Sequence, residues 1–370
     1  MLTAGDEYPI HQTPEPIAFA GSDRNFYDRF FFNGYSADGA TFFAAAMGIY
    51  PHLNIIDGAV SVLRGGKQSS VFFSRPLNME RMDMHVGGLS VEVLEPLKRV
   101  RLKLAETDGI ALDAEFTGRS APIEEPRFTR RIGPRMMMDL TRMTQNGRWS
   151  GKLRIDGQEI AIDPASWTGT RDRSWGVRPI GAPDPQPMIP PMPPQFYWLW
   201  TPTQFPNLSM FFHRNDDEHG EAWNTRAVLM PDGAPQGSGL HLGEANMDVR
   251  YAKGTRRMAS ATLAVKDPSG RPHTVEFEPM GTFLMKGLGY GHAKFRHGAF
   301  QGDQLMTVRE DWEPASLTWA NPENLHIQEI VRAVHKGPDG ETSTGIGAYE
   351  QLFIGKHAPS GFKDMLDGAG

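Results

Sequence analysis

The stretch "KLRIDGQEIAID", residues 152–163, shows the pattern that decides the fold. Leu153 and Ile155 alternate with charged residues, Asp156-Gly157 follows, and two isoleucines then resume the alternation. Alternation of period two places apolar side chains on one face of a strand, and Asp-Gly readily adopts the positive φ angles of a tight hairpin turn. The stretch therefore predicts a β-hairpin with one buried face.

The same plan recurs along almost the whole chain. "ATLAVKDPSGRPHTVEFEP" (261–279) repeats it around a turn that contains proline and glycine. Further turns are expected at Asp-Gly in 38–39, 57–58, 108–109, 232–233 and 339–340, and at Asn-Gly in 33–34 and 146–147. The best helix candidate is short, "GFKDMLDG" (361–368). These patterns predict an all-β protein.

A proline-rich stretch divides the chain. "RPIGAPDPQPMIPPMPPQ" (178–195) holds 8 of the 29 prolines, so it cannot form a central strand or a helix. We predict an N-terminal β domain over 1–180, an extended connector over 181–195 and a C-terminal β domain over 196–370. Each half has enough hairpin signals for a barrel or sandwich.

Composition excludes several classes of function. The net charge of −6 is mild and both signs are interspersed, which argues against a nucleic-acid partner. There is no cysteine, which excludes disulfides and thiolate metal sites. The N-terminus lacks a signal-peptide pattern, and no apolar run approaches the roughly 20 residues of a membrane helix. We expect a cytoplasmic protein without stable membrane insertion; its oligomeric state is not encoded in these patterns.

Familiar catalytic motifs are missing from the sequence. It contains no G-x-S-x-G elbow, no Walker loop and no H-E-x-x-H. The polar run "HRNDDEHGE" (213–221) is better interpreted as a solvated loop than as a metal site, because contiguous loop residues rarely converge on one ion. We therefore expect no metal and no cofactor.

Aromatic residues concentrate just after the connector, in "QFYWLWTPTQFPNLSMFFHR" (195–214). In a strand, Trp198 and Trp200 share one face while Tyr197 lies on the other. Most of these rings are expected to fill a barrel core. The alternative is that a partly open barrel uses them to line a pocket for a large apolar ligand.

"GTRDRSWGVRP" (169–179) crowds two arginines, an aspartate and a tryptophan together. In strand geometry the two arginines and Trp175 face one side and Asp172 the other. An arginine–carboxylate pair with an indole stacked on the guanidinium is a strong orienting device, here expected where two domains meet.

Three stretches resemble a known group of proteins. "WTGTRDRSWGVRP" (167–179) resembles a signature of the two-domain, lipocalin-like superfamily that includes the carotenoid 1,2-hydratases (hydroxyneurosporene synthases), kievitone hydratase-like and AttH-like proteins. "FFNGYSADGATFFAAAMGIYPHLNIIDGAV" (31–60) and "GIGAYEQLFIG" (345–355) look like further parts of that pattern. The resemblance implies two calycin-like antiparallel β-barrels packed together, a ligand cavity in or between them, and cofactor-independent chemistry on apolar substrates. Because members with different activities share the arginine motif, it favours a structural clasp, with Asp172 and Trp175 as contributors.

Such a cavity could hydrate an alkene, or reverse that reaction, with an acid, a base and π-faces. Burial in an apolar barrel would raise the pKa of a carboxyl group and let it act as the acid. The catalytic candidates are Asp172, His213, His292 and Glu350, and Asp311 is a further candidate for the acid. The candidates for substrate binding are Trp175, Tyr197, Trp198, Trp200, Phe212, Tyr290 and Tyr349.

The sequence thus predicts a cofactor-independent lyase or isomerase, most concretely a hydratase or dehydratase. Its substrate would be a bulky hydrophobic molecule such as a terpenoid, steroid or phenylpropanoid. The first alternative is a non-catalytic, lipocalin-like carrier of such a molecule, which needs only an apolar lining. The second is a carbohydrate-binding protein that uses the tryptophans as stacking platforms in an open groove. An enzyme should bring an acid and a base within about 3 to 7 Å of one point.

Overall fold

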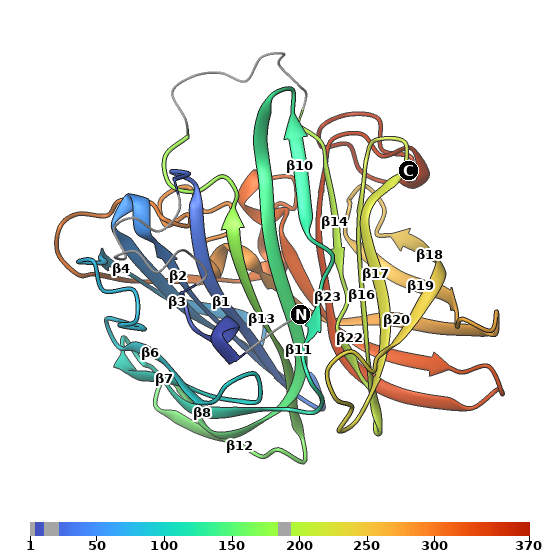
Figure 1. Ribbon diagram of the computed structural model, residues 1–370, viewed down its shortest axis with the longest axis horizontal. Coiled ribbons are helices and arrows are strands. Elements are labelled where there is room, and N and C mark those ends of the chain that lie inside the picture. Colours follow the sequence, from blue (N-terminus) through green and yellow to red (C-terminus); the bar gives the residue numbers. More distant parts are fainter. Residues whose placement is uncertain (1–3, 11–21, 184–193) are drawn as a thin grey trace. The chain divides into compact units, whose positions relative to one another are not determined.

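The computed structural model describes residues 4–10, 22–183 and 194–370 and confirms the all-β prediction. Its described part contains no α-helix; Figure 1 shows strands joined by turns and short 3-10 helices. The 3-10 helices are η1 (Ala4–Glu7), η3 (Pro51–Leu53), η4 (Met285–Leu288), η5 (Pro314–Ser316), η6 (Pro322–Asn324) and η7 (Ala358–Ser360).

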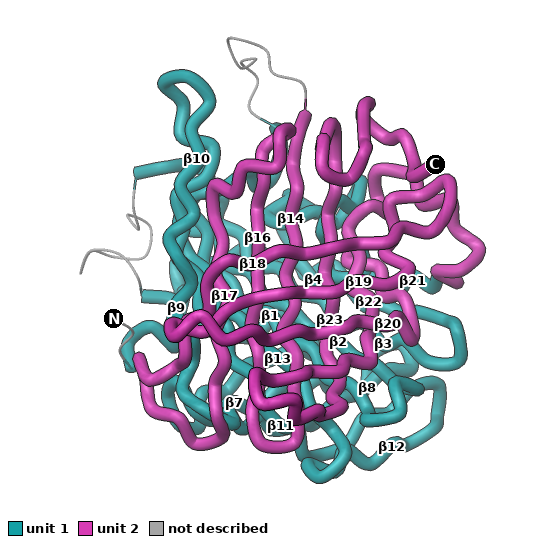
Figure 2. Tube along the Cα trace, turned by 90° about the vertical axis from the view of Figure 1, so that its right-hand side faces the viewer, with its two compact units in different colours: residues 1–192, 286–312 teal, residues 193–285, 313–370 magenta. Residues whose placement is uncertain are grey.

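The chain forms two compact units, drawn in different colours in Figure 2. Unit 1 comprises residues 1–192 and 286–312, and unit 2 comprises 193–285 and 313–370. Residues 286–312, which the sequence prediction placed in the C-terminal domain, thus belong to the first unit. The predicted connector, 181–195, lies mostly outside the described residues.

Unit 1 is built on a 14-stranded antiparallel sheet. Its main path runs β21-β4-β3-β2-β1-β13-β11-β8-β7-β6-β5, and β9, β10 and β12 also pair with β11. The strands are β1 (Phe26–Ser36), β2 (Thr41–Tyr50), β3 (Ile55–Arg64), β4 (Lys67–Pro76), β5 (His85–Val86), β6 (Leu89–Glu95), β7 (Arg99–Thr107), β8 (Ile110–Gly118), β9 (Ile123–Glu124), β10 (Phe128–Ile132), β11 (Arg135–Ile155), β12 (Gln158–Ile162), β13 (Trp167–Val177) and β21 (Met306–Trp312).

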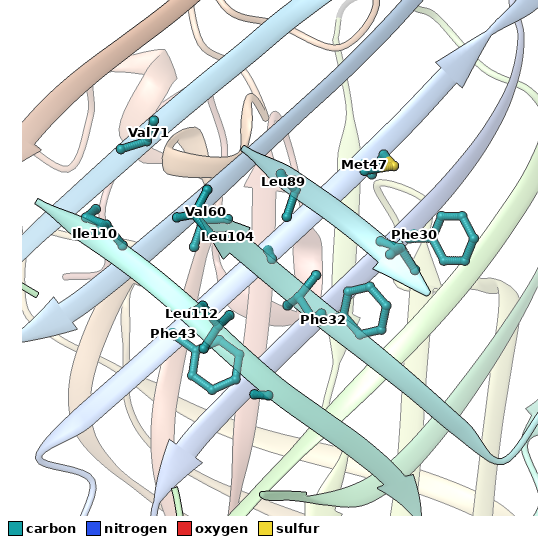
Figure 3. Close-up of a cluster of buried hydrophobic side chains, with 14 of the residues drawn as sticks. Phe30, Phe32, Phe43, Met47, Val60, Val71, Leu89, Leu104, Ile110 and Leu112 are labelled. Carbon is teal, nitrogen blue, oxygen red and sulfur yellow. The ribbon is translucent and has the colours of Figure 1, made fainter. Parts of the chain in front are cut away.

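The sheet of unit 1 folds over itself around one apolar core. Figure 3 shows β6, β7 and β8 crossing β1 to β4, with buried side chains such as Leu104 and Phe43 between the two layers. The inward residues alternate along β7 and β8, as period-two patterning requires. The hairpin at 152–163 forms as predicted, because β11 and β12 pair around Asp156-Gly157.

Unit 2 is a closed antiparallel barrel. Its strands pair in the ring β17-β16-β14-β23-β22-β20-β19-β18, which closes because β16 pairs with β17 and β14 with β23. The strands are β14 (Phe196–Trp200), β15 (Thr203–Gln204), β16 (Leu208–Asp216), β17 (Ala222–Pro231), β18 (Leu240–Tyr251), β19 (Met258–Lys266), β20 (Pro272–Leu284), β22 (Ile327–Lys336) and β23 (Thr342–Ile354). Closure leaves no sheet edge to protect, and the interior holds a second apolar core.

Three of the expected turns are wrong. The dipeptides 33–34, 57–58 and 146–147 lie inside β1, β3 and β11. In the first of these dipeptides, the Asn33 side chain forms a hydrogen bond within the sheet: its Oδ1 accepts from the Thr170 N–H at 2.7 Å. Gly147 faces Gly169 on β13, where small residues let the strands approach. At 33–34 and 146–147 the glycine of Asn-Gly therefore allows neighbouring strands to pack closely, and the chain does not reverse direction there.

The short helix expected over 361–368 is also wrong. The Arg256 guanidinium donates to the carbonyl oxygens of Asp364 and Asp367, and the Asp367 carboxylate accepts from the N–H groups of Lys363 and Asp364. Side chains therefore satisfy the backbone groups that a helix would pair internally.

The arginine motif forms carboxylate pairs, but not with Asp172. Arg171 binds Glu7 with two hydrogen bonds of 2.5 and 2.8 Å, and Arg173 lies 2.6 Å from Asp28. All four of these side chains are buried within unit 1. The motif thus ties β13 to β1 and to the N-terminal η1.

Candidate functional site

A cavity of about 650 Å³ opens in unit 1. It is bounded by the start of β11, by the segment that follows β13, and by the loop after η4. The residues that matter for its chemistry are Arg135, Met136, Arg178, Tyr290, His292 and His297. This volume suits a molecule of drug size.

Tyr290 lies close to two guanidinium groups at this cavity. The centroid of its ring is 5.1 Å from the Cζ of Arg29 and 5.8 Å from the Cζ of Arg178. Arg178 also stacks on Tyr27, at 4.4 Å from the ring centroid. The arrangement places the Tyr290 phenol close to the positive charges of Arg29 and Arg178.

His297 orients Arg178. Its Nε2 lies 3.0 Å from the carbonyl oxygen of Leu288, which can only accept, so this nitrogen carries the proton. The Nδ1 then accepts a hydrogen bond of 2.9 Å from the Nη2 of Arg178. His297 is therefore a neutral imidazole with both nitrogens in use.

His292 has a similarly fixed tautomer. Its Nδ1 accepts from the N–H groups of Lys294 and Phe295, both at 3.0 Å, and its Nε2 lies 3.1 Å from Glu310. To act as a base or proton relay, the role predicted for it, His292 would have to give up one of these bonds. Its ring does line the cavity, as does the predicted substrate-binding residue Tyr290.

A polar network lies behind Tyr290. Arg29 donates to the hydroxyl oxygen of Tyr50 at 3.2 Å, and that hydroxyl donates to Asp57 at 3.1 Å. Asp57 also accepts from the Gly298 N–H at 2.7 Å. Burial raises the pKa of Asp57, against the opposing charge of Arg29. A second cavity of about 20 Å³, lined by Arg29 and Asp57, has room for about one water molecule.

Asp172 and Trp175 lie half-buried on β13 of unit 1. Neither is among the described residues that line the 650 Å³ cavity. Asp172 lies close enough to Arg142 to favour the charged guanidinium and raise its pKa, although burial opposes this.

Glu350, in unit 2, is fully hydrogen-bonded. One carboxylate oxygen accepts from Trp198 and His326, both at 2.8 Å, and the other accepts from Gln328 at 2.5 Å. Burial alone would raise the pKa of Glu350, but His326 and the other donors lower it. The expected rise in pKa is therefore wrong for Glu350, because its donors favour the carboxylate, while its catalytic role stays a prediction.

The other predicted residues of unit 2 fall into two groups. Tyr197, Phe212 and Tyr349 belong to the apolar core of the barrel. Trp198 and Trp200 are buried on the opposite face of β14, where the ring of Trp198 lies 6.1 Å from His213. His213 is held at 3.0 Å from Asn224. The structure thus brings Trp198, His213 and Glu350 together in unit 2.

Sequence reasoning missed Glu329, a buried carboxyl group with a raised pKa. It lies on β22 beside Gln328, and both of its oxygens accept from the hydroxyl of Thr282, at 2.9 and 2.8 Å. Burial raises the pKa of Glu329 to about 7. The available signal was the one charged residue in the stretch "IQEIV" (327–331).

The sequence prediction also missed Arg29, Asp57, Arg178 and His297. The sequence predicts a turn at Asp57 because glycine follows it. The apolar residues on both sides, in "NIIDGAV" (54–60), indicate a continuous strand instead. No cluster of three or more His, Cys, Asp or Glu side chains suited to a metal ion occurs in residues 4–10, 22–183 and 194–370. Within the same residues, no helix has the length and apolar character needed to cross a membrane.

Comparisons with known proteins agree with this architecture. The model of a family described as "Family of unknown function (DUF8625)" matches residues 2–363. Kievitone hydratase from Nectria haematococca has a similar structure, with a TM-score of 0.54 and 12% identity over 88% of each chain. CghA, solved with Sch210972, gives 0.54 and 10% over 90% of each chain.

A putative AttH from Nitrosomonas europaea gives a TM-score of 0.53 and 11% identity over 92% of this chain and 98% of that one. No curated protein matches the sequence. At these identities the likeness shows the fold, and at that level it confirms the resemblance to the kievitone hydratase-like and AttH-like proteins.

Proposed function

The chain belongs to a family of unknown function, and from its unit 1 cavity we propose that it is a lyase of the hydratase or dehydratase type. It acts by acid–base chemistry on a bulky substrate with an apolar body. The observation that carries the proposal is the position of Tyr290, which lines a cavity of about 650 Å³ beside Arg29 and Arg178.

Tyr290 is the proposed acid and base. In the hydration direction, water attacks the β-carbon of an α,β-unsaturated carbonyl compound. The Tyr290 oxygen accepts one proton of that water and donates its own proton to the α-carbon. Negative charge that develops on the carbonyl oxygen is stabilised by Arg178, which His297 and Tyr27 hold in place. Dehydration follows the same steps in reverse.

The charge of the cavity favours this enolate route over alkene hydration through a carbocation, the route in which an acid and π-faces would take part. Arg135, Arg178 and Arg296 line the cavity, and a carbocation beside them would be repelled. An oxyanion in the same place is attracted. The aromatic walls that would stabilise a carbocation, Trp198 and Trp200, belong to unit 2.

The test is a hydration screen in ¹⁸O-labelled water. Purified protein is incubated with α,β-unsaturated ketones and acids of increasing apolar size, and products are detected by mass spectrometry. We expect a hydrated product carrying the heavy oxygen. Tyr290→Phe should lower kcat at least a hundredfold. Tyr35→Phe, at the far end of β1 in the same unit, is the matched control and should keep full activity.

The outcomes separate the enzyme from a carrier. Tight binding of these compounds without any labelled product would favour the carrier. Turnover that survives Tyr290→Phe would remove Tyr290 from the mechanism. If the compounds neither bind nor react, the proposed site is wrong.

A further inference from the structure

The charged side chains that line the unit 1 cavity are all positive among the described residues. Three arginines, Arg135, Arg178 and Arg296, line it together with two histidines, and none of the described lining residues is an aspartate or a glutamate. The protein as a whole has a net charge of −6. A positive cavity in a negative protein attracts anions to that point on the surface.

Two of these arginines have no carboxylate partner within 4.0 Å among the described residues. The Arg178 Nη2 donates to a neutral imidazole, and among the described residues its buried Nε has no acceptor. Arg296 is exposed on the loop after η4. Three other arginines of unit 1 do pair with carboxylates: Arg171 with Glu7, Arg173 with Asp28, and Arg142 with Glu125.

Arg178 is also held in position before any ligand arrives. His297 accepts from its Nη2, and the rings of Tyr27 and Tyr290 lie 4.4 and 5.8 Å from its Cζ. A guanidinium fixed in this way loses little side-chain entropy when it binds a planar anion. Met136 and Ile180, which line the same cavity, provide apolar contacts for the rest of a ligand.

We infer that the ligand of this cavity is an organic carboxylate with a bulky apolar body. Its carboxylate binds Arg178, with Arg296 providing further positive charge at the entrance. The inference rests on the proposed function in so far as the same cavity holds the substrate. It adds that the substrate is an acid, a class that the reaction alone does not require.

Binding is measured by titration calorimetry on the full chain. The probes are benzoate, 2-naphthoate and 1-pyrenecarboxylate, each compared with its neutral methyl ester. We expect at least one acid to bind at least tenfold more tightly than its ester. Arg178→Gln should weaken binding of the acid at least tenfold and leave the ester unchanged. Arg332→Gln, on an exposed position of unit 2, is the control and should change neither.

Two results would overturn the inference. If no acid binds at least tenfold more tightly than its ester, or if Arg178→Gln leaves the acid unaffected, the cavity does not select anions, while the proposed hydratase remains open to the labelled-water screen. If neither acids nor esters bind, the carboxylate inference fails, and a negative screen would then remove the proposed function as well.

Discussion

Neighbouring residues on one strand can have opposite electrostatic roles. Gln328 and Glu329 are adjacent on β22 and point to opposite faces of the barrel wall. Gln328 donates to Glu350, whose three donors lower its pKa. Among the described residues Glu329 accepts only from the Thr282 hydroxyl, and burial raises its pKa to about 7 against this bond and the charge of Arg257. The number of donors, not the depth of burial alone, decides which carboxyl group is ionised.

Glu329 should make the stability of the protein depend on pH. Its folded-state pKa of about 7 lies above its ordinary value of 4.5, so the folded state binds this proton more tightly. This contribution to the free energy of unfolding is full below pH 4.5 and is lost as the pH rises through 7. The loss amounts to about 3 kcal/mol. Urea unfolding of the wild type and Glu329→Gln between pH 5 and 8 measures it.

In Glu329→Gln this pH dependence should disappear, so the variant gains stability relative to the wild type as the pH rises. Glu278→Gln is the control, because this exposed carboxyl group lies on the neighbouring strand β20. A wild type and a Glu329→Gln variant with parallel pH profiles would show that Glu329 ionises normally.

At the scale of elements, period-two alternation predicts most strands correctly, including the hairpin of β11 and β12. The dipeptides that mark turns are less decisive. Asp156-Gly157 turns, whereas Asp57-Gly58 continues through β3. Both dipeptides could form a turn. Asp57-Gly58 is extended because β3 pairs with β2 on one side and β4 on the other. That pairing is tertiary, so local sequence could not decide it.

Small residues allow β1, β13 and β11 to pack closely at one level of the unit 1 sheet. Gly34 and Gly147 both pair with Gly169. The Trp149 indole crosses this level and donates to the Asn33 carbonyl at 2.9 Å. A side chain at Gly169 would meet both groups, because its Cβ would lie 2.0 Å from the Asn33 oxygen and 2.6 Å from the Trp149 Nε1.

Gly169→Ala should therefore destabilise unit 1. The added methyl group forces the indole and the neighbouring strand apart, and overpacking of this kind costs about 3 kcal/mol. Thermal unfolding followed by tryptophan fluorescence measures the loss. The control is Gly243→Ala on β18, where an added Cβ meets nothing within 4 Å. Equal melting temperatures for the two variants would contradict the close packing.

At the scale of the whole molecule, the chain returns to its first unit. β21 pairs with β4 along Met306–Trp312, and the loop before it supplies Tyr290, His292 and His297 to the cavity. The sequence prediction treated these residues as part of the C-terminal domain. Hairpin signals describe neighbours along the chain, so a strand that pairs with a partner more than two hundred residues away left no local trace. For this reason the site could be predicted only in part.

Cutting the chain between the two units should not separate the fragments. With a protease site inserted within 184–193, the cleaved protein should elute as one species in size-exclusion chromatography, because β21 stays paired with β4. Residues 1–183 expressed alone should aggregate, since the edge of β4 is then unpaired. A soluble, monomeric fragment 1–183 with native near-ultraviolet circular dichroism would contradict this role of β21.

Because β21 comes late in the sequence, the sheet of unit 1 can be completed only late in protein synthesis. A ribosome releases β1 to β13 first, and the strand that covers β4 emerges only after β14 to β20 have been made. During that interval the first sheet has an open edge and its cavity lacks a wall. Nascent chains in this condition pair with wrong partners more readily. We expect yield in the cell to depend on how quickly translation passes residue 312, and on chaperones that shield β4 until then.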